Sequence, residues 1–386
     1  MIRRLLAIGH DASRTGAPAT LLELLRWAHR ERGVEVTTVL LAGGPLADAF
    51  AEIGTVRAFP PALLNTRQAA SVLGHPRWSG PTERAWLRRA LAPAAGVDVV
   101  IASSAASLRA LPYLPRPAPP VVAHLHELDG VLDALGGSAH LAALAASAAL
   151  TVVPSDAVAD LVSRRVGAGG LGLPVRRVRR HPEPVRPPAR HPRPDHTGAA
   201  LVVGCGTIGW RKGTDLFVAL AHAVGPEVAG REVRWAWIGG DSGDGTAADV
   251  RDEIGLRGLT GRVHLTGEVD DAPLRLAAAD ILTVTSREDP YPLVAVEAAL
   301  AGTPVVGFRP GTTLLAEAGQ DSLRVDHLDV EVLATQVAEL LTAPDRGRLL
   351  AGDQARAATG ATTPLVAPAL WADIEAAATL ANGIPP

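Results

Sequence analysis

One carboxylate lies in the middle of an otherwise apolar segment. Residues 293–301 contain Leu, Val and Ala and a single charged residue, Glu297. Pro292 stands where a first helical residue belongs and Gly302 where a helix ends, so the pattern predicts a helix that is buried on most sides. An unpaired carboxylate in a core costs several kcal/mol. Glu297 therefore has to face an arginine, a narrow strip of solvent or a bound ligand with hydroxyl groups.

The start of the same helix can bind an anion. Pro292 has no backbone N–H, so the first free donors are the N–H groups of Leu293 and Val294. Such groups, together with the helix dipole, favour a phosphate at a helix N-terminus. A ligand that carries both phosphate and hydroxyl groups would satisfy these donors and Glu297 together.

The only lysine of the chain, Lys212, follows a glycine-rich loop. Residues 204–209 match G-x-G-x-x-G after an apolar run, which is the dinucleotide fingerprint and makes an NAD-dependent oxidoreductase one alternative. That fingerprint requires a helix to begin inside the motif, whereas residues 210–214 intervene here. The next apolar run, 233–238, also ends at Gly239, too late for the acidic residue that binds a ribose. We therefore favour a phosphate-binding loop with Lys212 at its tip.

A pair of histidines follows another apolar run. In residues 121–127, Val-Val-Ala-His-Leu-His-Glu, a strand would place His124 and His126 on one face, at the carboxyl end where open α/β sheets bind ligands. A metal site would need a third ligand at a suitable spacing, and the sequence reveals none. The other alternative for such a pair is a structural histidine of the core, which we expect for His124.

Residues 281–308 resemble the signature of the retaining, nucleotide-sugar-dependent glycosyltransferases of group 1, which have the GT-B fold. That signature is a carboxylate, seven residues and a glutamate, followed by a small-residue turn and Gly-x-Pro-Val-Val. Asp289 and Glu297 occupy the two acidic positions here. The segment is similar to a Glu-Asp-Pro-aromatic-Pro variant, with Pro292 at the usual glycine. It leaves open whether Glu288 or Asp289 contacts the sugar.

The resemblance assigns roles to individual residues. Three residues are expected to act in catalysis. His126 would contact the sugar near its reacting carbon, Lys212 would bind the diphosphate, and Asp289 would orient the sugar. The residues expected to bind the donor are Gly16, Arg211, Glu288, Tyr291, Leu293, Val294, Glu297, Val269 and Gly239. Glu297 would hold the ribose, and the backbone at Val269 would contact the base. Gly206 stands where the family has an arginine, and Arg211 is the candidate replacement.

The resemblance also implies the partners of the protein. The donor would be a nucleoside diphosphate sugar, a UDP or GDP sugar first of all, and the acceptor a small molecule or a glycan in natural-product or glycan biosynthesis. No metal and no cofactor would be required. No side chain need be the nucleophile, because the departing phosphate can take the proton of the acceptor. A catalytically inactive nucleotide-sugar-binding protein is the alternative, because Asp289, Pro292 and Gly206 all depart from the family pattern in the donor site.

Short apolar runs alternate with helical patterns along the chain, which predicts an α/β protein with parallel sheets. We expect the GT-B architecture, in which two Rossmann-like, doubly wound domains face each other across a cleft. The predicted segments are an acceptor-side domain (1–182), a Pro-rich linker (183–198), a donor-side domain (199–365) and a C-terminal helix that returns to the first domain (366–386).

The composition of the chain excludes several classes of function. The 386 residues include 47% hydrophobic ones and carry a formal net charge of -3, which argues against nucleic-acid binding over the whole molecule. The single cysteine, Cys205, excludes an internal disulfide and a cysteine-cluster metal site. No segment has the length and apolarity of a signal peptide or a membrane span, so we expect a cytoplasmic protein with at most weak membrane association. The sequence leaves the oligomeric state open.

Overall fold

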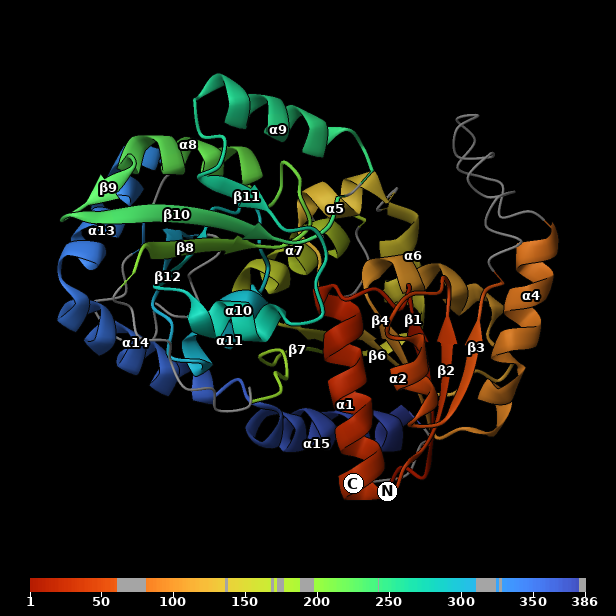
Figure 1. Ribbon diagram of the computed structural model, residues 1–386. Helices are drawn as coiled ribbons and strands as arrows, with labels where there is room; N and C mark the ends of the chain where they lie inside the picture. The colour runs from red at the N-terminus through yellow and green to blue at the C-terminus, as the bar shows by residue number, and fades with distance from the viewer. Residues whose placement is uncertain are drawn as a thin grey trace. The chain divides into compact units, whose positions relative to one another are not determined.

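The computed structural model describes residues 1–60, 81–135, 138–167, 170–171, 177–187, 198–241, 243–309, 324–325 and 328–381. The chain divides into two compact units, which are Met1–Pro184 with Thr363–Pro386 and, between them, Val185–Thr362 (Figure 1). Val185 already belongs to the second unit, because its N–H donates a hydrogen bond to the carbonyl oxygen of Ala361 at 3.0 Å. Most of the predicted linker, residues 188–197, lies outside the described residues.

The first unit contains a parallel sheet in the strand order β3-β2-β1-β4-β5-β6-β7. The order reverses between β1 and β4, and open α/β sheets bind ligands at the carboxyl ends of the strands beside such a reversal. The strands are β1 (Arg4–Gly9), β2 (Glu35–Leu40), β3 (Thr55–Ala58), β4 (Val99–Ser103), β5 (Val121–His124), β6 (Ala148–Val153) and β7 (Val178–Arg180).

Alternate residues of β1 enter two different cores of the first unit, as the period of a strand requires. Leu5 and Ala7 lie in the core that also contains residues of helix α15, whereas Leu6 and Ile8 lie in the other core. The ring of Trp371 in α15 packs against that of Trp27, with 6.1 Å between the centroids. The C-terminal helix is thus part of the first unit. The helices are α1 (Gly16–Arg32), α2 (Ala47–Ala51), α4 (Pro81–Leu91), η1 (Ala92–Gly96), η2 (Ala105–Tyr113), α5 (Asp129–Ala134), α6 (Ser138–Ser147), α7 (Asp156–Val166) and α15 (Thr363–Ala381).

The second unit contains a sheet in the order β11-β10-β8-β12-β13-β14, in which these strands run parallel, and β9 pairs antiparallel with β10. Its order reverses between β8 and β12. The strands are β8 (Ala200–Cys205), β9 (Glu227–Val228), β10 (Arg231–Ile238), β11 (Val263–Leu265), β12 (Ile281–Val284), β13 (Val305–Phe308) and β14 (Arg324–Val325).

The second unit also has a core on each face of its sheet. Val202 packs in one core with Phe217, Trp235 and Trp237, and Val203 packs in the other with residues of helix α11. Phe217 lies edge-on to both tryptophans, at centroid distances of 5.3 and 5.2 Å. The helices are α8 (Thr214–Val224), α9 (Thr246–Leu256), α10 (Ala272–Ala278), α11 (Leu293–Leu300), α13 (Val330–Thr342) and α14 (Pro344–Thr359).

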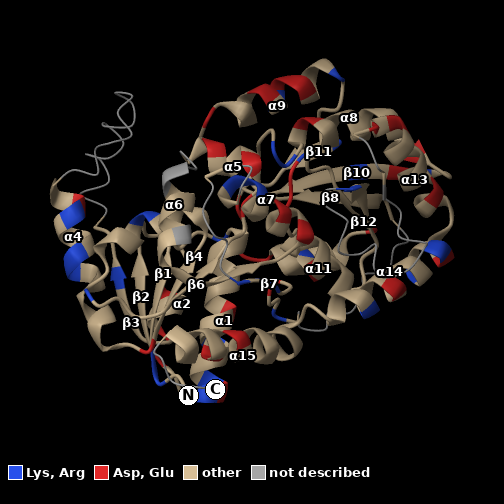
Figure 2. Ribbon diagram, turned by 180° about the vertical axis from the view of Figure 1, so that it is seen from behind, with Lys and Arg blue, Asp and Glu red and all other residues tan. Residues whose placement is uncertain are grey.

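Charged residues of both signs lie on the helices of both units (Figure 2). Helix α4 is mainly basic, with Arg84, Arg88 and Arg89, whereas α9 is mainly acidic. In the described part of the chain, no helix combines the length and apolarity needed to cross a bilayer.

Two local predictions need correction. Strand β5 ends at His124, so His126 lies in the loop beyond the strand and does not share a strand face with His124. Pro292 is the residue before helix α11 and not its first helical residue. In both cases the element is where the apolar pattern predicts it, and the error concerns where strand β5 ends and where helix α11 begins.

Candidate active site

The loops at the carboxyl ends of β8 and β10 pass each other backbone to backbone. Gly239 has a φ of 152°, and a Cβ atom added there would lie 1.9 Å from the carbonyl oxygen of Gly206. Its N–H donates to the carbonyl oxygen of Gly267 at 3.0 Å, which brings the loop that contains Val269 alongside. Trp237 donates its Nε1–H to the same Gly206 oxygen at 2.8 Å. Only glycines allow this approach.

The glycines of the G-x-G-x-x-G match have packing roles. A Cβ atom at Gly204 would lie 2.5 Å from the ring of Trp237, so this glycine makes room for a core side chain. Gly206 has a φ of 142°, and a Cβ there would meet the Lys212 side chain at 3.1 Å. An arginine at position 206, as the family has, would therefore need a different loop. Helix α8 begins only at Thr214, outside the motif, as the sequence argument against a dinucleotide site requires.

The two residues predicted to act on the diphosphate and the sugar form an ion pair. Lys212 Nζ lies 2.6 Å from Oδ2 of Asp289, and Ser286 Oγ donates to the same oxygen at 3.2 Å. Asp289 is buried and 6% exposed, while the side chain of Lys212 is 17% exposed. Gly213 supports this contact, because its φ of 66° brings the backbone against Thr285, whose hydroxyl donates to the Gly213 oxygen at 2.9 Å.

The neighbouring pair, Arg211 and Glu288, is joined through the backbone. Arg211 Nη1 donates to the carbonyl oxygen of Glu288 at 3.0 Å. Both side chains are half-buried. The guanidinium therefore already ties the two loops together, and its proposed substitution for the family arginine remains a prediction.

Arg287 is a site residue that sequence analysis missed. It forms a bidentate ion pair with Asp215, at 2.7 and 2.6 Å, and donates to the carbonyl oxygen of Trp210 at 2.8 Å. Its guanidinium also lies 5.1 Å from the Trp210 ring centroid. Burial would raise the pKa of Asp215, but the hydrogen bonds and charge of Arg287 hold it below its usual value. Arg287 therefore fastens the loop that carries Lys212 to the start of α8.

Glu297 has neither a hydrogen-bond nor an ion-pair partner among the described residues, so the alternative of an arginine partner is not observed. Its side chain is half-buried, and burial raises the pKa of its carboxyl above the ordinary value. Burial, followed by the charge of Glu297, also raises the pKa of the Cys205 thiol to about 12, and Lys212 acts against this rise. Glu297 and Lys212 therefore each lie near Cys205, at the carboxyl end of β8.

The start of helix α11 carries three of the predicted donor-binding residues. The hydrogen bonds of its first turn begin with the N–H of Ala295, which donates to Pro292, so the N–H groups of Leu293 and Val294 precede the helical ladder. Tyr291 is 6% exposed and belongs to the core beside α11. Its ring therefore anchors the loop ahead of the helix.

In the first unit, Gly16 is the exposed first residue of α1, after the N-cap residue Thr15. The Thr15 side chain makes no capping hydrogen bond, and Ala17 follows in the first turn. The predicted role of Gly16 in binding a phosphate remains a prediction that this local geometry permits.

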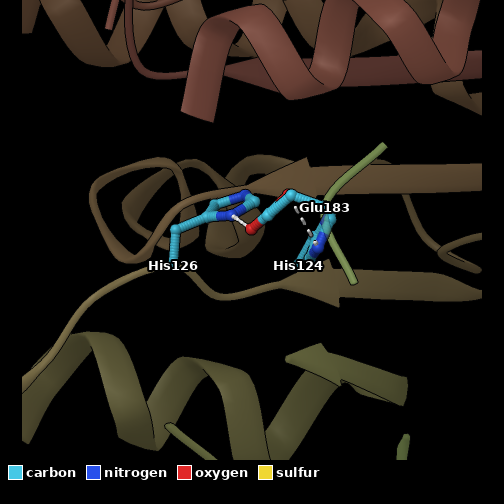
Figure 3. A group of neighbouring side chains, drawn as sticks. All are labelled: His124, His126 and Glu183. Carbon is cyan, nitrogen blue, oxygen red and sulfur yellow. Dashed lines mark hydrogen bonds and ion pairs between the residues drawn. The ribbon is translucent and has the colours of Figure 1, made fainter. Parts of the chain in front are cut away.

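Glu183 joins the two histidines, as Figure 3 shows. His126 Nδ1 lies 2.5 Å from Glu183 Oε1, and His124 Nε2 lies 3.7 Å from Glu183 Oε2. The other ring nitrogen of His126 is 3.1 Å from Oγ of Ser103 at the end of β4. A third group with metal-ligand chemistry is therefore present, contrary to the sequence analysis. It was missed because it lies 57 residues beyond His126 and inside the predicted linker.

The electrostatics of these buried groups are coupled. Burial alone would lower the pKa of His126, but the charge and hydrogen bond of Glu183 raise it above its ordinary value. Burial, with the neighbouring His126, lowers the pKa of His124 to about 3. Burial would raise the pKa of Glu183, yet His126 and His124 hold it below its usual value. These directions favour an ionised Glu183 beside a charged His126, with His124 neutral.

The family model "Glycosyl transferases group 1" matches residues 199–343. The matched residues lie within the second unit, Val185–Thr362. Among curated proteins, the chain is similar to a D-inositol 3-phosphate glycosyltransferase 2 of Catenulispora acidiphila, with 36% identity over 156 residues, 38% of this chain and 36% of that protein. The chain spans about a third of the length of the curated relatives it matches.

Solved glycosyltransferase structures match almost the whole chain. Anabaena HepE, solved in complex with UDP and glucose, has a TM-score of 0.76 and 18% identity, and the match covers 96% of this chain and 99% of HepE. Sucrose-phosphate synthase from Thermosynechococcus elongatus has a TM-score of 0.66 and 18% identity, over 97% of this chain and 100% of that chain. These likenesses confirm the predicted fold class, two parallel-sheet α/β units of the GT-B type.

Proposed function

We propose that this protein transfers a sugar from a UDP-sugar to a small-molecule or glycan acceptor, with retention of the anomeric configuration. The observation that carries the proposal is the Lys212–Asp289 pair, which lies at the carboxyl edge of the second unit's sheet, within the residues that the group 1 glycosyltransferase model matches. A cation, a carboxylate and a helix N-terminus at this edge are the groups that a nucleoside diphosphate sugar needs.

The leaving diphosphate would be stabilised mainly by Lys212. In the described structure the ammonium group is paired with Asp289, which has a second donor in Ser286. When the diphosphate binds, Lys212 can turn to it, and Asp289 becomes free to accept hydroxyl groups of the sugar. A charge-assisted hydrogen bond to a developing negative charge contributes about 1.5–3 kcal/mol, and it acts most strongly in the transition state.

Glu297 would bind the ribose. Its carboxyl lacks a partner in the described residues and is half-buried, so two hydroxyl groups would compensate its desolvation. The N–H groups of Leu293 and Val294 would meet a phosphate, and the backbone at Val269 would contact the base. UDP is the nucleotide of choice because the solved structure of Anabaena HepE contains UDP.

Transfer would need neither a metal nor a side-chain nucleophile. Lys212, Arg211 and the start of α11 supply positive potential for the leaving group, and Gly16 at the start of α1 would add a further backbone donor. The departing phosphate oxygen would accept the proton of the acceptor hydroxyl. By its resemblance to the family, His126 would contact the sugar near its reacting carbon.

The test is turnover of UDP-glucose and related UDP-sugars with a pool of glycan and small-molecule acceptors, with and without EDTA. We expect a glycosylated product by mass spectrometry, and an α-linkage from an α-donor by the anomeric proton coupling. A β-linked product would contradict retention. If the protein binds UDP yet turns over no donor, it is instead the inactive binding protein that the Gly206 and Asp289 departures suggest.

A further inference from the structure

The ring of His126 is held at both nitrogens. Nδ1 lies 2.5 Å from Glu183 Oε1, and Nε2 lies 3.1 Å from Ser103 Oγ. The backbone N–H of His126 donates to Glu127 Oε2 at 3.0 Å, which fixes the main chain as well. These partners come from three places in the sequence, the end of β4, the loop after β5 and the segment after β7. The ring therefore has one orientation available.

The distance between Glu183 and His126 favours a hydrogen bond over a shared metal ion. Two ligand atoms of a tetrahedral zinc ion, each about 2.0–2.1 Å from the metal, stand roughly 3.3 Å apart. The 2.5 Å separation of Nδ1 and Oε1 is far shorter, shorter even than the roughly 2.7–2.9 Å of charge-assisted N–H···O bonds, so the two atoms meet directly as a hydrogen-bonded pair. In Figure 3 the Glu183 carboxylate lies between the two rings, with this oxygen directed at His126.

The proton of this bond belongs to His126. Glu183 is 3% exposed, and a buried carboxylate is ionised only where a cation compensates it. His124 cannot supply that cation, because its Nε2 makes no hydrogen bond and lies 3.7 Å from Glu183. Among the described residues, Glu127 also acts on His126, His181 on His124, and the Thr20 hydroxyl on Glu183. Glu183 and His126 thus neutralise each other.

We propose that Glu183 is a positioning residue that keeps the His126 ring oriented and protonated for sugar transfer. The inference rests on the proposed function, in which His126 contacts the donor sugar. A protonated ring cannot accept a proton, so His126 contributes a fixed positive charge beside the sugar. This agrees with a mechanism in which the leaving phosphate, and no side chain, takes the acceptor proton.

The direct test is the protonation state of His126 by NMR of 15N-histidine-labelled protein, with His126→Asn to assign the signal. We expect an imidazolium in the wild type at pH 7.5 and a neutral ring in Glu183→Gln. Glu127→Gln is the matched control, because Glu127 bonds to the backbone and not to the ring, and its effect should be smaller. A neutral ring in the wild type, or an imidazolium that survives in Glu183→Gln, would overturn the proposal.

Kinetics supply a second readout. Glu183→Gln should lower kcat about ten- to a hundredfold, with UDP affinity within about twofold of the wild type, and should move the alkaline limb of the pH profile to lower pH. Glu183→Asp should restore part of kcat and should keep the ring protonated, which also covers the case that Glu183→Gln does not fold. Stoichiometric zinc in the purified wild type that Glu183→Gln loses would refute the assignment. If the wild type turns over no UDP-sugar, the proposed function fails, while the NMR result still decides the state of His126.

Discussion

Replacing Lys212 tests the residue that we propose contributes most to stabilising the leaving diphosphate. Lys212→Met keeps most of the volume of the side chain and removes its charge. The lost bond to the leaving phosphate is worth about 1.5–3 kcal/mol, and each 1.4 kcal/mol corresponds to about tenfold in rate. We therefore expect kcat for donor turnover to fall about ten- to a hundredfold.

The same substitution leaves Asp289 without its cation. Because Asp289 is 6% exposed and keeps only Ser286 as a donor, we expect a loss of about 1–3 kcal/mol in the free energy of unfolding. This cost is smaller than for a fully buried pair, since the Lys212 side chain is 17% exposed. Calorimetry would show it as a lower Tm.

A double variant separates the two effects. Lys212→Met with Asp289→Asn removes both charges, so the Tm should recover while the donor turnover stays low. Lys212→Arg keeps the charge and serves as the control for side-chain shape. A kcat within about threefold of the wild type in Lys212→Met, at saturating donor, would refute the role of Lys212 in stabilising the leaving group.

Three further predictions concern the same unit. Glu297→Gln should weaken UDP binding about tenfold or more in calorimetric titration. The wild type should lose UDP affinity as the pH falls through the raised pKa of Glu297, and the variant should not show this loss. Unchanged affinity in the variant would contradict the ribose role of Glu297. Asp289→Ala should abolish donor turnover and Glu288→Ala should reduce it less, because only Asp289 contacts Lys212; the reverse order would show that the register is wrong. Gly239→Ala should lower the free energy of unfolding by about 1–3 kcal/mol more than Gly261→Ala does. Gly261 is the control, because it has a φ of 82° but no atom within 4 Å of an added Cβ. Equal losses in denaturant titrations would contradict the backbone clash at Gly239.

The fold was predictable because its signals are local. The apolar runs at Leu5–Ile8 and Val263–Leu265 lie in strands β1 and β11, and helix α11 covers most of the predicted segment. Buried strands and helices can be recognised from the composition and the periodicity of short segments of the sequence. The boundaries are less certain, since a strand such as β5 ends where its hydrogen-bond partners end and not where its pattern does.

The site was predictable only in part. Lys212 and Asp289 are 77 residues apart, and their pairing could be expected from the family pattern but not from their own surroundings. Glu183 and Arg287 act through partners that only the folded chain brings near, and Glu183 lies in a Pro-rich segment with no periodicity. The absence of an arginine at Gly206 also has a local cause that no pattern reveals, namely the positive φ of Gly206 and the Lys212 side chain beside it.

The most direct test of the account is nucleotide binding by the purified protein, measured as thermal shifts with UDP, GDP, ADP, dTDP and NAD, with and without EDTA. We expect a strong shift with UDP, because ligand at about 100 times its dissociation constant adds roughly 2.7 kcal/mol of stability. EDTA should not change this shift, since the proposed site needs no metal. A shift with NAD and none with any nucleoside diphosphate would contradict it and would favour the oxidoreductase that the G-x-G-x-x-G match suggests.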